Sequence, residues 1–88
     1  MVISFAKAQN KTDSLRRELR KKSGSERVDI LNKLTIDSWL NYPDIAEQYA
    51  KEALFLARAS GDSTKISKSL RLLGGVFLYQ GFEAIRNN

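Results

Sequence analysis

The chain of 88 residues contains no cysteine and no histidine. The absence of cysteine excludes disulfide bonds, a thiolate nucleophile and cysteine-ligated metal. The absence of histidine removes the commonest general base and the commonest metal ligand. The acidic pairs that remain for acid–base chemistry are Asp37 with Asp44 and Glu47 with Glu52. Neither pair has a nucleophile or a metal-ligand partner beside it, so we predict a non-catalytic protein without cofactor or metal.

Proline and long apolar runs are also scarce. The chain has one proline and five glycines, which argues against long disordered or collagen-like stretches. No run approaches the roughly 20 apolar residues that a membrane span requires. Hydrophobic residues make up 42 % of the chain and charged residues 28 %, which suits one small domain with its own core.

Positive charge is concentrated near the N-terminus. Residues 1–22 carry a net charge of +5, residues 23–62 carry −3 and residues 63–88 carry +3. One alternative is therefore a small nucleic-acid-binding helical protein whose affinity falls with salt. Its contacts would be Arg16, Arg17, Arg20, Lys21 and Lys22. No aromatic side chains are interleaved with this basic run to stack on bases, so we favour a solvated basic helix and do not expect nucleic acid as the partner.

The first residues resemble the end of a signal peptide. The apolar run Val2–Phe5 precedes Ala6-Lys7-Ala8, which has the small-x-small pattern of a cleavage site. The run is too short for a complete signal. We predict that residues 1–9 are a signal-peptide remnant or a disordered N-terminus, and that residues 10–88 form one helical domain. A remnant would place the protein outside the cytoplasm, in the periplasm or cell envelope; otherwise it is cytoplasmic.

The apolar period of 3.6 residues predicts four helices, at about 13–22, 25–40, 43–60 and 63–80. The expected end signals are Thr12 or Asp13, the capping box Ser23 with Glu26, Pro43, Gly61, and Asp62 or Ser63. The third helix is rich in alanine, namely Ala46, Ala50, Ala53, Ala57 and Ala59. Small residues at spacings i, i+4 and i+7 predict a flat strip for a neighbouring helix. Gly74-Gly75 predicts close approach of a neighbouring helix in the same way.

The sequence also repeats itself weakly. Residues 34–39 superpose on residues 73–78 at an offset of 39, with a leucine followed by a small residue in both copies. A period of 20–50 residues in a chain of helical hairpins indicates an α-solenoid.

Residues 26–81 resemble tetratricopeptide repeats. The residues that carry the resemblance are Ala46, Ala50 and Ala53 in the second helix of a unit, the pairs Leu34-Thr35 and Leu73-Gly74, Phe77, and Tyr79-Gln80-Gly81 as the turn of a second unit. Ser38 departs from the pattern, which has a large residue there. The long second helix and the turn at Pro43 are similar to the variant repeats of bacterial envelope sensor and regulator proteins. The resemblance implies an all-α, solenoid-like fragment of antiparallel helical hairpins, about one and a half repeats long.

The resemblance also implies a function and a site. Tetratricopeptide repeats bind a protein or peptide in a concave groove, which predicts a non-catalytic interaction module, such as a fragment of the sensory region of a bacterial signalling protein. The groove positions carried over to this chain are Asn32, Ile36, Trp39, Lys68, Arg71 and Leu78. The partner would be a protein or peptide, further repeats, or a second copy of the chain. The self-associating alternative uses the exposed face of residues 66–79.

Overall fold

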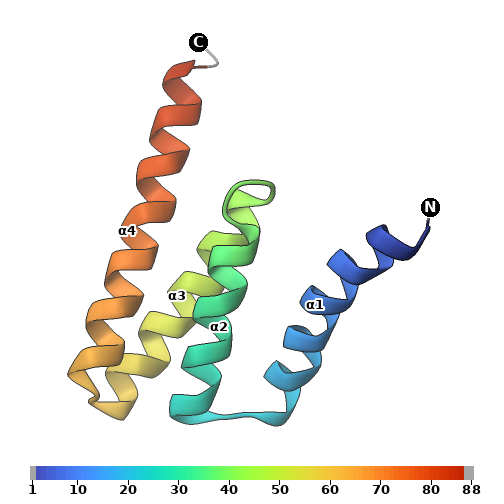
Figure 1. The fold of residues 1–88 in the computed structure, drawn as a ribbon. Coiled ribbons are helices and arrows are strands. Elements are labelled where there is room, and N and C mark those ends of the chain that lie inside the picture. The colour runs from blue at the N-terminus through green and yellow to red at the C-terminus, as the bar shows by residue number, and fades with distance from the viewer. Residues whose placement is uncertain (1, 87–88) are drawn as a thin grey trace.

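Four α-helices make up the fold, and short connections join each helix to the next (Figure 1). The computed structural model describes residues 2–86, with side chains from residue 12 onwards. The helices are α1 (Val2–Lys21), α2 (Gly24–Ser38), α3 (Pro43–Ser60) and α4 (Ser63–Arg86). No strand occurs within residues 2–86, which confirms the prediction of an all-α fold.

Two helices are longer than predicted. Helix α1 begins at Val2, before the expected start at residue 13, because neither glycine nor proline interrupts the chain there. Helix α4 continues to Arg86, so the turn predicted at Tyr79-Gln80-Gly81 is wrong. A single glycine costs a helix only about 1 kcal/mol, and no proline accompanies Gly81 to stop the helix. The predicted signal-peptide remnant or disordered N-terminus, residues 1–9, lies outside the residues whose side chains are described.

The turn between α3 and α4 follows the sequence signals closely. Gly61 adopts the left-handed conformation, with φ of 75°, and its N–H donates to the carbonyl oxygen of Ala57. Asp62 then caps α4, because its Oδ1 accepts the N–H of Thr64 at 3.0 Å and of Lys65 at 3.2 Å. Both bonds satisfy donors that a helix N-terminus leaves free. The predicted caps at Gly61 and Asp62 are confirmed.

The signals before α2 and α3 differ in outcome. Pro43 is the first residue of α3, as predicted, where its missing N–H costs the helix nothing. Ser23 precedes α2 with an extended backbone, but its side chain makes no capping hydrogen bond. The predicted capping box of Ser23 with Glu26 is therefore wrong, and Glu26 lies 3.7 Å from Lys22 of the preceding connection instead.

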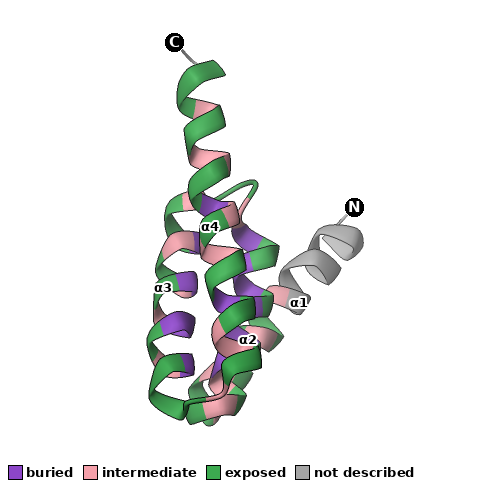
Figure 2. Cartoon of the chain, turned by 90° about the vertical axis from the view of Figure 1, so that its left-hand side faces the viewer, coloured by how far each residue is buried: buried purple, intermediate pink, exposed green. Residues whose placement is uncertain are grey.

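The core lies between α2 and α3. The alanine strip is confirmed: the fully buried alanines of α3 are Ala46, Ala50, Ala53 and Ala57. Val28 and Leu31 of α2, also fully buried, pack against Ala53 and Ala57. Figure 2 shows buried segments on α2 and on the side of α3 that faces it. Because alanine projects little beyond the backbone, α3 lies close to α2, and Val28 and Leu31 of α2 fill the space between the two backbones.

The helices form a thin layer. The chain measures 43 × 36 × 15 Å along its principal axes. Helix α2 packs against α1, α3 and α4, whereas α1 packs against α2 alone among the described helices. Figure 1 shows α1 and α4 on opposite sides of α2. This arrangement leaves one side of α2 and much of α4 facing solvent.

Gly74 and Gly75 differ in their surroundings. A Cβ on Gly75 would lie 3.3 Å from Cζ3 of Trp39, whereas a Cβ on Gly74 would have no neighbour within 4 Å. Of these two glycines, the predicted close approach therefore holds only at Gly75, where the ring of Trp39, the residue directly after α2, fills the space.

Gly74→Ala is expected to raise the free energy of unfolding by about 0.5–1 kcal/mol, because alanine favours a helix interior over glycine. Gly75→Ala is the matched control. The same gain there is offset by the contact with Trp39, so we expect it to be less stable than Gly74→Ala by about 1 kcal/mol. Urea unfolding followed by circular dichroism measures both. Equal gains in the two variants would contradict the close contact.

Candidate functional site

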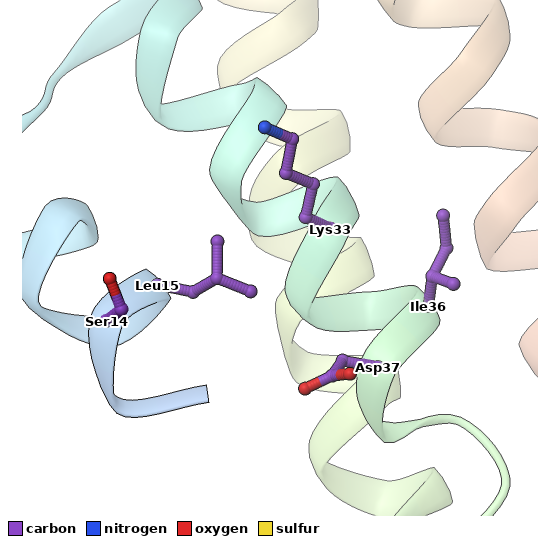
Figure 3. A pocket seen from close by; sticks show the side chains of 5 residues that line it. All are labelled: Ser14, Leu15, Lys33, Ile36 and Asp37. Atoms are coloured by element: carbon purple, nitrogen blue, oxygen red, sulfur yellow. The ribbon is translucent and has the colours of Figure 1, made fainter. Parts of the chain in front are cut away.

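An open cleft lies between α1 and α2. It encloses about 500 Å³ and is lined by Ser14, Leu15, Lys33, Ile36 and Asp37. Figure 3 shows Leu15 of α1 pointing across the cleft towards α2. The cleft combines two aliphatic side chains with one basic and one acidic group, a composition that suits a peptide more than a purely apolar ligand.

Polar contacts at its two ends hold α1 on α2. The Thr12 hydroxyl donates to Asp37 Oδ2 at 2.7 Å. At the other end, Nη1 of Arg27 donates to the carbonyl oxygen of Leu19 at 2.7 Å. This second bond satisfies a carbonyl near the C-terminus of α1 with a charged donor. The cleft exists because α1 is tied at these points while the space between them stays unfilled.

Arg27 joins three helices. Besides its bond to α1, its Nε donates to Glu52 Oε2 of α3 at 2.7 Å. The Arg27 side chain is 28 % exposed, so this ion pair is partly shielded from water. Partly buried pairs of this kind are screened by salt less than exposed ones. Arg27 therefore couples the position of α1 to the α2–α3 core.

One face of α2 remains uncovered. Its exposed residues Asp29, Lys33 and Ile36, together with Leu40 in the turn that follows the helix, are called the α2 stripe. The spacing of i, i+4 and i+7 places Asp29, Lys33 and Ile36 in line along α2. Ile36 is 53 % exposed and Leu40 is 59 % exposed. Two large exposed apolar side chains are a feature of interaction surfaces, and Ile36 also lines the cleft.

The structure corrects one of the predicted groove residues and places another in packing. Asn32 is 1 % exposed and accepts a hydrogen bond from Ser69 Oγ of α4 at 3.4 Å, so it is not a groove residue. Trp39 is half-buried, and its ring centroid lies 6.2 Å from that of Tyr79 of α4. Both residues belong to the contact between α2 and α4. Lys33 and Leu40 belong to the α2 stripe with Ile36, and the sequence prediction missed both. The signal that could have identified them is their spacing of three and four residues from Ile36.

The remaining predicted groove residues lie on solvent-exposed surface. Lys68, Arg71 and Leu78 of α4 are all exposed, and Leu78 is 62 % exposed. Lys68 and Arg71 are one helical turn apart, so their cationic groups lie on neighbouring positions of one surface. Their role in binding, like that of Ile36, stays a prediction.

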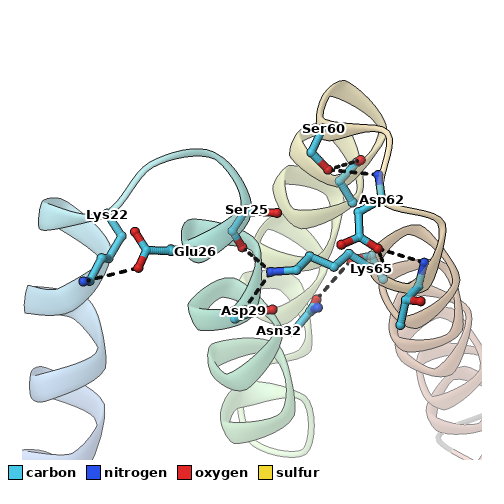
Figure 4. A network of polar contacts seen from close by, with 11 residues as sticks. Lys22, Ser25, Glu26, Asp29, Asn32, Ser60, Asp62 and Lys65 are labelled. Carbon is cyan, nitrogen blue, oxygen red and sulfur yellow. Dashed lines mark hydrogen bonds and ion pairs between the residues drawn. The ribbon is translucent and has the colours of Figure 1, made fainter.

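Charged and polar side chains attach α4 to the rest of the fold (Figure 4). Lys65 Nζ donates to the carbonyl oxygen of Ser25 at 2.8 Å and to Asp29 Oδ2 at 2.9 Å. Further along α4, Gln80 Nε2 donates to Glu47 Oε1 of α3 at 3.0 Å. Helix α4 is thus tied to α2 near its start and to α3 near its C-terminal third.

The basic residues of α1 from residue 12 onwards point into solvent. Arg16, Arg17, Arg20 and Lys21 are exposed, and Lys22 lies 3.7 Å from Glu26. Exposed pairs of this kind contribute little to stability. The exposed charges agree with a solvated basic helix and leave the nucleic-acid alternative untested.

The replacement of Asn32 and Ser69 together tests the assignment of Asn32 to packing. Within the described contacts, Nδ2 of Asn32 is buried without a hydrogen-bond partner. A buried unpaired donor costs about 1–3 kcal/mol. We therefore expect the double variant Asn32→Leu with Ser69→Ala to raise the free energy of unfolding by about 1 kcal/mol or more, measured by urea unfolding. Ser69→Ala alone is the control, and a destabilised double variant would contradict the assignment.

The Glu47 carboxylate predicts a pH dependence. Hydrogen bonds from Lys51 and then from Gln80 lower the pKa of Glu47 below its ordinary value. A carboxyl whose pKa is lowered on folding stabilises the fold above its unfolded pKa. That contribution is lost as pH falls through the folded pKa. Glu47→Gln should therefore lose less stability on acidification than the parent chain, as measured by thermal unfolding across acidic pH; parallel pH profiles would contradict the contact.

Comparison of the chain with protein-family models, curated proteins and solved structures gave no match. None of the helices within residues 2–86 is long and apolar enough to cross a membrane. The described side chains also form no cluster of three or more acidic groups able to hold a metal ion. Among the described residues, the features suited to binding a partner are the α2 stripe, the cleft beside it and the exposed charges of α4.

Proposed function

We propose that the chain is a non-catalytic protein–protein interaction module of tetratricopeptide type, which binds a peptide or helix along the α2 stripe. The observation that carries the proposal is the exposure of Ile36 on α2 and of Leu40 in the turn after it, with Ile36 at the edge of the cleft that also contains Leu15. An apolar side chain held on a rigid helix, as Ile36 is, binds a partner at low entropic cost.

The charges of this surface favour an acidic partner. Asp29 is paired with Lys65, and Asp37 accepts a hydrogen bond from Thr12. Within the described contacts, no ion pair neutralises Lys33, Lys68 or Arg71. The cationic groups are thus available to bind a partner, whereas the carboxylates of Asp29 and Asp37 already have partners within the chain. A peptide with acidic residues flanking an aliphatic anchor would match this pattern.

The wider setting of the module follows from the sequence resemblance. The proposal places it in the sensory region of a bacterial signalling protein, on the extracytoplasmic side if the N-terminal segment is a signal-peptide remnant. The support is the likeness to the variant repeats of envelope sensors and the Ala6-Lys7-Ala8 pattern.

Selection of peptides from a random display library on the immobilised 88-residue chain tests the proposed function. We expect acidic peptides with an aliphatic anchor, and we expect Ile36→Glu to weaken their binding by about tenfold or more, through loss of apolar burial and added repulsion. Ile85→Glu is the control, because Ile85 is 74 % exposed on α4 and outside both the stripe and the cleft. Affinities come from isothermal titration calorimetry.

Two results would contradict this function. One is a set of peptides whose affinity is unchanged by Ile36→Glu. The other is binding of a nucleic-acid duplex that falls steeply with salt and is lost with Arg16→Glu and Arg17→Glu, which would favour the nucleic-acid alternative.

A further inference from the structure

Helix α4 presents an apolar face that the described helices leave partly exposed. Leu70 and Phe77 are each 46 % exposed, and Gly74 lies between them on the same side of the helix. A Cβ on Gly74 would meet nothing within 4 Å, so the face is open at its middle. We call Leu70, Gly74 and Phe77 the α4 face.

The internal repeat shows what covers the equivalent face of α2. At the offset of 39 residues, Leu70 corresponds to Leu31, Gly74 to Thr35 and Phe77 to Ser38. The three equivalent residues of α2 are buried: Leu31 is 0 % exposed, Thr35 is 1 % exposed and Ser38 is 6 % exposed. Leu31 on this side of α2 packs against the buried alanines Ala53 and Ala57 of α3. These positions are thus buried in α2, whereas the equivalent residues of α4 are exposed to solvent.

We propose that the α4 face binds one antiparallel helix with a stripe of alanines like that of α3. The docked helix is none of the helices α1–α4. The α4 face and the α2 stripe are separate surfaces, because they share no residue. The inference deepens the proposed function and rests on it, because it treats α2–α3 as one unit of a helical repeat that α4 begins again.

Residues of α3 beside the α4 face support a helix lying against both α3 and α4. Lys51 Nζ lies 5.9 Å from the centroid of the Phe77 ring, which places that side of α3 next to the α4 face. Phe55 follows Lys51 by one helical turn and is 72 % exposed. The docked helix therefore meets aromatic rings from both helices. Small residues on the docked helix suit this arrangement, because Phe77 occupies more volume than Ser38 does at the equivalent position of α2.

A second copy of the chain is a poorer occupant. Its own alanine stripe is unavailable, because Ala46, Ala50, Ala53 and Ala57 are fully buried against α2 in each copy. Two α4 helices facing each other would also have to accommodate Phe77 from both sides. Self-association through residues 66–79 is therefore an outcome that the test below must separate from docking of a helix.

The test uses a peptide with the sequence of residues 43–60, labelled with fluorescein, and the full 88-residue chain. Fluorescence anisotropy should show saturable binding, and Leu70→Ser or Phe77→Ser should each weaken it by about tenfold, the equivalent of one large apolar contact. Ile85→Ser is the matched control: Ile85 is 74 % exposed but lies more than two helical turns beyond Phe77, outside the α4 face. It should leave the affinity unchanged. A peptide with Ala50→Arg and Ala53→Arg should not bind.

Disulfide trapping checks the direction of the docked helix, since the chain has no cysteine of its own. Ser67 corresponds to Val28, which packs in the cluster with Ala57. Ser67→Cys in the chain should therefore cross-link to a peptide carrying Ala57→Cys. It should not cross-link to a peptide carrying Ala46→Cys, whose thiol lies at the far end of an antiparallel helix. The reverse preference would overturn the proposed orientation.

Three other results would overturn the proposal. The first is absence of peptide binding at millimolar concentration. The second is binding that Leu70→Ser and Phe77→Ser leave unchanged, which would place the peptide elsewhere. The third is a dimer of the parent chain, seen by sedimentation equilibrium, that Leu70→Ser abolishes. Peptides selected on the α2 stripe should still bind Phe77→Ser, so loss of this interface and loss of the proposed function are measured separately.

Discussion

The close packing of α3 on α2 is the contact on which the other contacts in this chain depend. Four fully buried alanines of α3 face α2, where Val28 and Leu31 fill the space between the backbones. Because the alanines leave no room for adjustment, a larger side chain at any of them would force the helices apart. The short distance also brings Glu52 within reach of Arg27, whose other bond holds the end of α1. The position of α1, and with it the cleft, follows from this packing.

Three sides of α2 contact the other helices, and its fourth side carries the candidate site. Alanines cover it on one side, Ser69 and Tyr79 of α4 contact Asn32 and Trp39 on a second, and Thr12 of α1 bonds Asp37 on a third. The residues left over form the α2 stripe. A helix held by three neighbours loses little entropy on binding a fourth, which is the physical basis for treating the stripe as a binding surface. Helix α4 repeats the pattern of α2 with fewer neighbours, and its bare face is the counterpart of a buried one.

Local chemistry made much of the fold predictable. Gly61, Asp62 and Pro43 act within one or two turns of themselves, and the structure confirms each of them. The ends of α1 and α4 were harder, because a helix continues wherever nothing stops it, and Gly81 alone is a weak stop. The capping box predicted at Ser23 does not form, and the Glu26 carboxylate lies 3.7 Å from Lys22 Nζ. Candidate-site residues were predicted less well. Asn32 and Ile36 are four residues apart in sequence, but Asn32 is buried and Ile36 is exposed.

By itself, the sequence determined that the chain is helical, where most of the helix breaks fall and which strip of α3 is small enough to pack. These properties depend on backbone propensity and side-chain volume, which each residue carries with it. Only the tertiary structure decided which side of α2 is left exposed, because that depends on where α1 and α4 pack around it. Asn32 shows the difference: its type and spacing suit a groove, yet the position of Ser69 on α4 encloses it. Whether a residue is buried depends on neighbours that are distant in sequence. The helical period shows that buried residues share one face of a helix, but it does not show which face that is.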